Sequence, residues 1–239
     1  MKFTYSNPTV LFFGQGRIEA IAKAIPKGKK VLVVYGGGSI KNNGIYNQVE
    51  KALENHEWDS FGGIEPNPSV QTLRKAVEKI KAEEFNFVLA VGGGSVIDGC
   101  KFLSAAALYE GDGWDLMTGK ARIKSALPMG VVLTLAATGS ESNTTFVVSN
   151  PEQQAKLAML SRFVQPQFAV LDPDVLKSLP ERQIANGLVD AFVHCCEQYL
   201  TYPSDAMVQE SYAEGLMISL LNLSQRFHQQ DDAWRANLM

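Results

Sequence analysis

A short apolar segment that runs into three glycines constrains this fold more than any other part of the chain. Residues 87–91 are all apolar and include several β-formers, which is typical of a strand buried on both faces of a sheet. Glycines occupy positions 92–94, and residues 96–108 then have the pattern of an amphipathic to buried helix. Ser95 is expected to be the N-cap of that helix. A strand, a glycine turn and a helix in this order favour a βαβ unit and a parallel sheet.

The same glycines suggest that an anion binds here. Glycine has no Cβ and can take positive φ, so backbone N–H groups can approach a phosphate closely. The N-terminus of the following helix adds free N–H donors and the positive end of a dipole, which suit a pyrophosphate. A tight turn without a ligand remains an alternative, because Ser95 and Asp98 form an S-x-x-D capping box that stabilises a helix start by itself.

Strand and helix patterns alternate over the first three-quarters of the chain. Strands are expected at residues 10–13, 30–35, 59–61, 87–91, 128–135 and 168–171, with helices at 17–25, 46–55, 70–83 and 96–108. Only helices are expected afterwards, at 181–199, at 204–226 with Ser204 as N-cap, and from about 231 onward. The sequence therefore predicts an α/β fold: a Rossmann-like, dinucleotide-binding parallel-sheet domain over residues 1–180, then the first helices of an incomplete all-helical domain over 181–239. The last helical pattern has no glycine or proline stop, so the chain is expected to be the front part of a longer protein.

Composition excludes several classes of partner. The chain has 239 residues and a formal net charge of −3 at pH 7, with no basic stripe of the kind that binds nucleic acid. Its N-terminus lacks the apolar core of a signal peptide, and no apolar run reaches the roughly 18–20 residues of a membrane helix. Three cysteines do not make a disulfide framework. We therefore expect a cytoplasmic protein with no nucleic-acid or membrane partner.

A second GGGS tetrapeptide bears on the choice of nucleotide. It covers residues 36–39, directly after the expected strand at 30–35. In dinucleotide-binding folds an acidic residue near the end of such a strand often binds the ribose 2′-hydroxyl and favours NAD. Here Gly36 stands instead, with Ser39 and Lys41 just beyond it, and this set would accept a 2′-phosphate, which favours NADP(H). A simple turn with a solvated Lys41 is the alternative.

Two further clusters carry polar chemistry. Four hydroxyl side chains follow an apolar strand: Thr134, Thr138, Ser140 and Ser142. They could meet the phosphates or carboxamide of a cofactor, or form turns with their own backbone.

Asp190 and His194 lie four residues apart on an expected helix and therefore share one face. A carboxylate and an imidazole suit Fe²⁺, Zn²⁺ or Mn²⁺, although two residues at this spacing alone are more often an ion pair or a capped core histidine. Neither His56 nor His228 is a convincing third ligand.

Taken in order, these motifs resemble the iron-containing (group III) alcohol dehydrogenases, and in particular the branch of NADPH-dependent aldehyde reductases and butanol dehydrogenases. The resemblance is carried by six segments that span nearly the whole chain: GGGS at 36–39, FGGIEPNP at 61–68, AVGGGSVID at 90–98, TLAATGSES at 134–142, AVLDP at 169–173 and DAFVH at 190–194. It implies NADP(H), a divalent metal that is Fe²⁺ or Zn²⁺, a small aldehyde or primary alcohol as substrate, and a homodimer.

The resemblance also implies roles for individual residues. The cofactor would be held by three groups: the pyrophosphate by Gly93, Gly94 and Ser95; the 2′-phosphate by Gly37, Gly38 and Ser39; and the phosphate and nicotinamide side by Thr134, Thr138, Asp98 and Lys156. Asp190 and His194 would be two of four metal ligands, the other two being histidines downstream of residue 239. Two alternatives stay open: an inactive nucleotide-binding fragment, and a relative such as a glycerol dehydrogenase or dehydroquinate synthase that uses NAD, against which Gly36 argues.

Overall fold

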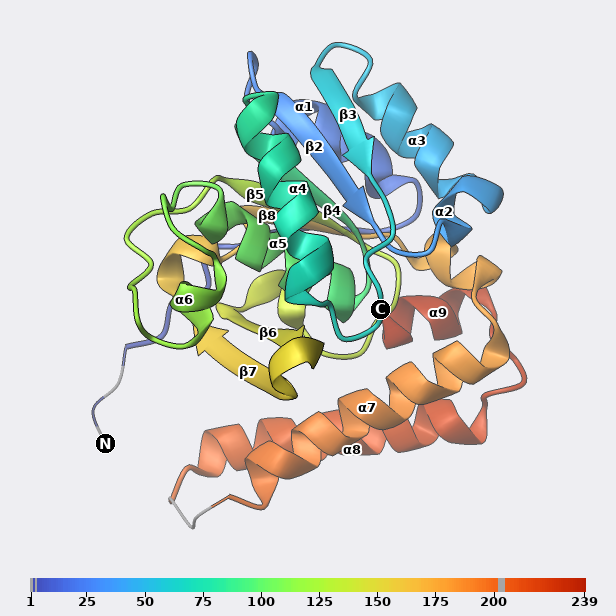
Figure 1. Ribbon diagram of the computed structural model, residues 1–239. Helices are drawn as coiled ribbons and strands as arrows, with labels where there is room; N and C mark the ends of the chain where they lie inside the picture. The colour runs from blue at the N-terminus through green and yellow to red at the C-terminus, as the bar shows by residue number, and fades with distance from the viewer. Residues whose placement is uncertain (1, 3, 202–204) are drawn as a thin grey trace.

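Six parallel strands form the centre of the protein in the computed structural model, which describes residue 2, residues 4–201 and residues 205–239 (Figure 1). Their order across the sheet is β1-β8-β5-β4-β2-β3. The strands are β1 Val10–Phe13, β2 Lys30–Tyr35, β3 Glu57–Phe61, β4 Phe87–Gly92, β5 Met129–Leu133 and β8 Phe168–Leu171. The expected parallel α/β sheet is thus confirmed, with strand ends shifted by a few residues.

Helices cover both faces of the sheet, and the alternation of side chains along each strand divides the core between them. The connecting helices are α1 Ile21–Ala24, which continues the 3-10 helix Arg17–Ala20, α2 Ser39–Asn42, α3 Ile45–Ala52, α4 Val70–Ala82, α5 Gly94–Ala106 and α6 Trp114–Met117. In β2, Leu32 and Val34 belong to one buried cluster with residues of α4 and α5. Val31 and Val33 belong to a second cluster with residues of α1 and α3. Successive side chains point to opposite faces, so one apolar strand supplies both cores.

The helix after the glycine turn starts two residues earlier than the sequence predicts. Gly93 is its N-cap and α5 begins at Gly94, so the N-cap role of Ser95 was wrong. Ser95 Oγ instead accepts a hydrogen bond from the N–H of Asn67, at 3.4 Å. The capping box with Asp98 was wrong as well, because that carboxylate accepts hydrogen bonds from the Ser140 hydroxyl and from the backbone N–H of Val147. Loops distant in sequence compete for these oxygen atoms, and local pattern alone cannot reveal them.

An antiparallel hairpin was missed. It consists of β6 Thr145–Asn150 and β7 Ala155–Leu160, which form a separate two-stranded sheet joined by the 3-10 turn Pro151–Gln153. The hairpin packs against α5. Its residues alternate between partly buried and exposed along β7, which is the period of a strand with one face in solvent. No element was expected there, although short apolar runs stand at residues 146–148 and 157–160.

The last part of the described chain is helical, as expected. The helices are α7 Glu181–Tyr199, α8 Met207–Gln225 and α9 Asp232–Leu238, and α7 packs alongside α8 (Figure 1). Trp234 in α9 donates its indole N–H to the carbonyl of Leu223 in α8, at 2.9 Å. The predicted N-cap Ser204 lies outside the described residues. The division into two domains near residue 180 remains a prediction.

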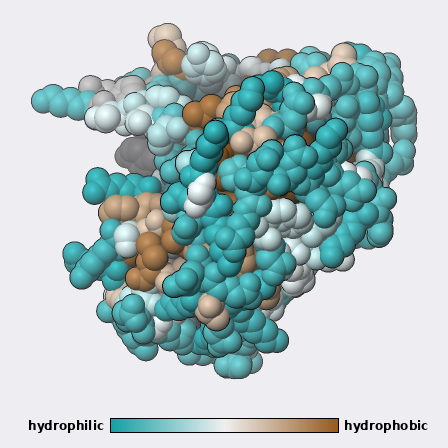
Figure 2. All heavy atoms as spheres, turned by 90° about the horizontal axis from the view of Figure 1, so that it is seen from above, coloured by the Kyte–Doolittle hydropathy of each residue, from teal (hydrophilic) through white to brown (hydrophobic). Residues whose placement is uncertain are grey.

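Exposed apolar side chains are concentrated on the two long helices. The view from above shows a mostly hydrophilic face with hydrophobic atoms between polar side chains (Figure 2). On α7 and α8 the large exposed hydrophobic residues are Val189, Val193, Tyr199, Met207, Val208, Tyr212, Leu216, Ile218 and Leu221. Within the described residues, no helix has the length and apolar character needed to span a membrane.

Candidate active site

One cavity collects most of the residues that the sequence singles out. The loops after β4 and β5 leave neighbouring strands at the same edge of the sheet, because the strands are parallel and hydrogen-bonded to each other. A cavity of about 500 Å³ lies there, bounded also by the β6–β7 hairpin and α7. Seven of the predicted site residues line it: Gly94, Ser95, Asp98, Thr138, Lys156, Asp190 and His194. Ligands of open α/β sheets bind at this carboxyl edge, so the cavity is the candidate active site.

The N-terminus of α5 and the loop after β5 approach each other closely. A Cβ added at Gly94 would lie 2.9 Å from Thr138 Oγ1, so only glycine fits this position without a shift. The first hydrogen bond of the helix runs from the N–H of Val96 to the carbonyl oxygen of Gly93, at 3.0 Å. The N–H groups of Gly94 and Ser95 come before it and belong to the unpaired first turn of the helix. This arrangement can accept an anion in the cavity.

The remaining predicted cofactor residues lie beside the cavity and do not line it. The backbone N–H of Thr134 donates to the carbonyl of Gly92 at 3.1 Å, which continues the pairing of β4 with β5. A Cβ at Gly93 would come within 3.2 Å of the Leu135 side chain. Gly37, Gly38 and Ser39 follow β2, the neighbour of β4 on the other side. They lie along the same edge of the sheet as the cavity.

The turn after β2 is built around a left-handed residue. Gly38 has φ +93° and caps the short helix α2. Lys41 in that helix is exposed, and its Nζ lies 5.1 Å from the ring centre of Tyr35 and 5.0 Å from that of Tyr46. The contact with Tyr35 raises the pKa of Lys41 above its ordinary value. A positive charge is therefore held at the end of β2, where it already makes cation–π contacts with both rings.

A buried lysine behind the cavity was missed by the sequence analysis. Lys101 in α5 is 0% exposed. Its Nζ donates to Ser140 Oγ at 2.9 Å, to Asn143 Oδ1 at 2.9 Å and to the carbonyl of Thr145 at 2.7 Å. The signal in the sequence was a single lysine at position 101 in a mostly apolar helix, where a charge needs partners from elsewhere in the fold.

Asp98 is held in place by two donors. Its Oδ1 accepts from Ser140 Oγ at 2.7 Å and its Oδ2 from the N–H of Val147 at 2.9 Å. Burial raises the pKa of Asp98, while the hydrogen bond from Ser140 and the charge of Lys101 act in the opposite direction. The carboxylate faces a cavity that is also lined by Lys156. Lys156 itself donates to Asn67 Oδ1 at 2.7 Å, across the mouth of the site from β7 to the loop after β3.

The predicted metal pair lies on the wall formed by α7. His194 Nε2 is 3.7 Å from Asp190 Oδ2, and His194 Nδ1 is 3.5 Å from Glu197 Oε2. Both members of the pair are about half exposed and line the cavity. A Cβ at Gly187 would overlap the carbonyl oxygen of Ala136, so a glycine is needed for α7 to approach the loop after β5. That close approach brings the pair to the cavity.

The pair supplies two donors of a metal site. A carboxylate and an imidazole that both line the cavity fit a borderline divalent cation such as Fe²⁺ or Zn²⁺. Within residues 2, 4–201 and 205–239, no group of three or more histidine, cysteine or acidic side chains is gathered closely enough to hold a metal. The geometry is therefore compatible both with half of a metal centre and with the weak ion pair that spacing alone suggests.

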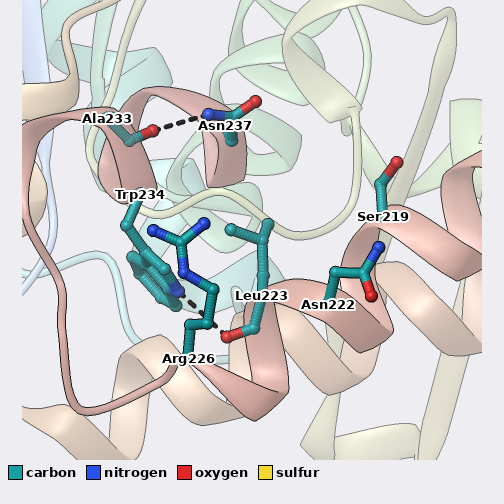
Figure 3. Close-up of a pocket in the computed structure, with 7 residues that line it drawn as sticks. All are labelled: Ser219, Asn222, Leu223, Arg226, Ala233, Trp234 and Asn237. Carbon is teal, nitrogen blue, oxygen red and sulfur yellow. Dashed lines mark hydrogen bonds between the residues drawn. The ribbon is translucent and has the colours of Figure 1, made fainter.

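Another depression lies between α8 and α9, away from all the predicted site residues (Figure 3). Trp234 and Arg226 face it, and Asn237 Nδ2 donates to the carbonyl of Ala233 at 2.7 Å. Ser219 and Asn237 bond within their own helices and Trp234 bonds to the carbonyl of Leu223, and the depression contains none of the carboxylate, imidazole or glycine features of the main cavity. We therefore assign the candidate site to the carboxyl edge of the sheet.

Comparisons with known proteins agree with this geometry. Residues 8–173 match the family model described as iron-containing alcohol dehydrogenase. The chain is 48% identical to the NADPH-dependent aldehyde reductase YqhD of Escherichia coli, over 99% of this chain and 62% of that protein. It is 39% identical to the NADH-dependent butanol dehydrogenase A of Clostridium acetobutylicum, over 100% of this chain and 63% of the relative.

The solved structures agree as well. The crystal structure of Escherichia coli YqhD superposes with a TM-score of 0.96 at 47% identity, and the match covers 100% of this chain and 62% of the other. The chain thus spans about 62% of the length of this relative. The family match covers the loops after β2, β4 and β5, and the matches to YqhD also include α7 with its Asp190–His194 pair. By sequence and by fold, this protein belongs to the iron-containing alcohol dehydrogenases.

Proposed function

We propose that the chain supplies the nucleotide site and two metal ligands of an oxidoreductase that interconverts small aldehydes and primary alcohols with NADP(H). The observation that carries this proposal is that the N-terminus of α5, Lys156 and the Asp190–His194 pair all line one cavity. A nucleotide site and a metal pair in one cavity suit hydride transfer, because that reaction requires donor and acceptor to be held side by side.

When bound, the nucleotide supplies or accepts the hydride, and the divalent cation supplies Lewis acidity toward an oxygen of the substrate. The side chains and backbone of this protein do the positioning. The free N–H groups of Gly94 and Ser95 bind the pyrophosphate, and Lys156 adds a positive charge. Asp98 and Thr138 face the nicotinamide end, while Asp190 and His194 hold the cation on the facing wall. The glycine contact between Gly94 and Thr138 sets the width of the nucleotide site.

The turn after β2 supports NADP(H) over NAD(H). Residues 36–39 provide glycine N–H groups and the exposed hydroxyl of Ser39, and Lys41 holds a positive charge nearby. A carboxylate at the strand end would repel a 2′-phosphate and bind a ribose hydroxyl instead. The names of the relatives include both an NADPH-dependent and an NADH-dependent enzyme, so the choice rests on this turn.

Fluorescence titration with NADPH and with NADH tests the nucleotide site. We expect NADPH to bind at least about tenfold more tightly, which corresponds to roughly one charge-assisted contact with the 2′-phosphate. Tighter binding of NADH would overturn the choice of NADP(H), and failure to bind either nucleotide would overturn the proposal. Oxidation of NADPH by a short aliphatic aldehyde, with Fe²⁺ or Zn²⁺ supplied anaerobically, then measures the reaction itself.

The metal ligands are tested separately by equilibrium dialysis of Fe²⁺ and Zn²⁺. Asp190→Ala should remove metal binding and leave the dissociation constant of NADPH within about twofold, because the carboxylate contacts the cation and not the nucleotide. Glu78→Ala, which changes an exposed acidic residue on α4, serves as the control and should change neither quantity. Unchanged metal content in Asp190→Ala would contradict the assignment.

A further inference from the structure

All three N–H donors of the buried Lys101 ammonium are hydrogen-bonded to the segment after β5 that lines the cavity. Three acceptors surround it: the Ser140 hydroxyl, the Asn143 amide oxygen and the Thr145 carbonyl, at 2.7–2.9 Å. An ammonium group has three N–H donors, so each donor has one acceptor. All three acceptors belong to the segment 138–145, between β5 and β6. A single side chain of α5 therefore ties this segment to the helix whose N-terminus faces the cavity.

The network continues from Lys101 to the cavity wall. Ser140 Oγ accepts from Lys101 and donates to Asp98 Oδ1 at 2.7 Å. Ser140, Asn143, Thr145 and Asp98 all line the cavity, whereas Lys101 lies behind them. The hydroxyl of Ser140 has one proton, and accepting from Lys101 directs that proton toward the carboxylate. The orientation of Asp98 in the site thus depends on a residue that does not reach the site.

We propose that Lys101 is a positioning residue: its ammonium fixes the segment 138–145 and, through Ser140, orients the carboxylate of Asp98 for nucleotide binding. The consequence for nucleotide affinity rests on the proposed function, whereas the consequence for the order of the segment does not. Neutral side chains of the same length fill the same space without donating a hydrogen bond. Lys101→Met consequently separates the charge from the packing.

The charge of Lys101 gives the network a pH dependence. Burial lowers the pKa of Lys101 from 10.5 to about 8, and the negative charges of Asp98 and Glu141 oppose this effect. Asp98 also faces Lys156, and burial raises the pKa of Glu141. A neutral amine has only two N–H donors, so one of the three acceptors loses its partner above about pH 8. Nucleotide affinity should therefore fall as the pH rises through about 8.

Stability should change in the opposite direction. Between about pH 8 and 10.5 the unfolded chain keeps the proton on Lys101 while the folded chain has lost it. Stability rises with pH wherever the unfolded state binds more protons, so the contribution of Lys101 to stability increases over this range. Burial of the ammonium alone produces the stability trend, whereas the fall in nucleotide affinity also requires that the lysine positions the nucleotide site. Opposite pH trends in nucleotide affinity and in stability, both absent from Lys101→Met, are thus the signature of the proposed role.

Hydrogen–deuterium exchange and nucleotide titration on the full chain test this proposal. In Lys101→Met we expect amide exchange in residues 138–145 to become at least about tenfold faster, and the dissociation constant of NADPH to rise by about tenfold, because charge-assisted hydrogen bonds are lost. The fall in affinity near pH 8 should disappear. Lys75→Met, which changes an exposed lysine on α4, should leave all three quantities unchanged.

A second variant keeps the test decisive if Lys101→Met does not fold. Ser140→Ala retains the buried lysine with two of its three acceptors and cuts only the connection to Asp98. It should weaken NADPH binding by several-fold with a smaller effect on exchange in the segment. Unchanged exchange and unchanged affinity in the folded variants would overturn the proposal. If the wild-type chain binds no nucleotide, the proposed function fails, and exchange in residues 138–145 still decides whether Lys101 positions the segment.

Discussion

At the scale of single residues, two kinds of position determine the site: glycines where two backbones meet, and polar groups that lack local partners. Gly94 belongs to the first kind, because a Cβ there would press on Thr138. Lys101 and Asp98 belong to the second, because their partners come from the segment after β5. The glycines are visible in the sequence as a motif. The polar partners are visible only when the loop is folded over the helix.

Gly94→Ala should weaken nucleotide binding without unfolding the protein. The added Cβ would lie 2.9 Å from Thr138 Oγ1, so α5 and the loop after β5 must separate at the proposed nucleotide site. We expect the dissociation constant of NADPH to rise by about tenfold or more in a fluorescence titration. Gly99→Ala is the matched control in the same helix: its Cβ would meet the flexible Leu73 side chain at 3.1 Å, and Gly99 itself does not line the cavity. An equal loss of affinity in both variants would contradict a local role for Gly94.

At the scale of elements, the position of α7 decides whether the Asp190–His194 pair lines the cavity. Spacing along the helix places the two side chains on one face, but it does not say what that face meets. The glycine at 187 allows the helix to lie directly against the carbonyl of Ala136 in the loop after β5. The pair follows one to two turns later and therefore reaches the cavity. The contact between this helix and this loop thus joins the two halves of the site.

Gly187→Ala should lower stability and disturb the metal pair together. A Cβ at this position would overlap backbone, which cannot rotate away as a side chain can, so α7 must shift. Overpacking of this kind costs about 1–3 kcal/mol, which thermal or urea denaturation can measure. Gly215→Ala provides the same substitution in α8, where an added Cβ meets nothing within 4 Å. That variant should be stabilised by about 0.5–1 kcal/mol, and a loss of similar size in both would refute the packing argument.

At the scale of the whole molecule, the helices after residue 180 share buried contacts with the sheet. Ile184, Leu188, Leu223, Trp234 and Leu238 belong to one apolar cluster together with side chains of β2, β4 and β8. Trp234 is 1% exposed and connects α9 to α8 through its indole N–H. Buried contacts that extend across elements couple their unfolding. The long helices should therefore melt together with the sheet, even though much of their outer surface is apolar and exposed.

Trp234→Ala tests this coupling. Removal of a fully buried indole costs about 3 kcal/mol or more, from lost burial and from the cavity left behind. We expect the denaturation midpoint, followed by circular dichroism, to fall for the whole chain in a single transition. Tyr212→Ala on α8 removes an aromatic ring that is 72% exposed and should change stability by less than about 0.5 kcal/mol. A separate early transition of the helices alone in Trp234→Ala would show that they are not coupled to the sheet.

The sequence by itself determined the parallel α/β sheet, the two glycine turns, the helical last part and twelve candidate site residues, of which seven line one cavity. These features depend on short-range order, since apolar periodicity and glycine positions act within a few residues. Only the tertiary structure decided the partners of Ser95 and Asp98, the burial of Lys101 and the approach of α7 to the loop after β5. Those contacts join residues about 30 to 50 positions apart, and local patterns carry no information about which distant groups compete for the same hydrogen bond.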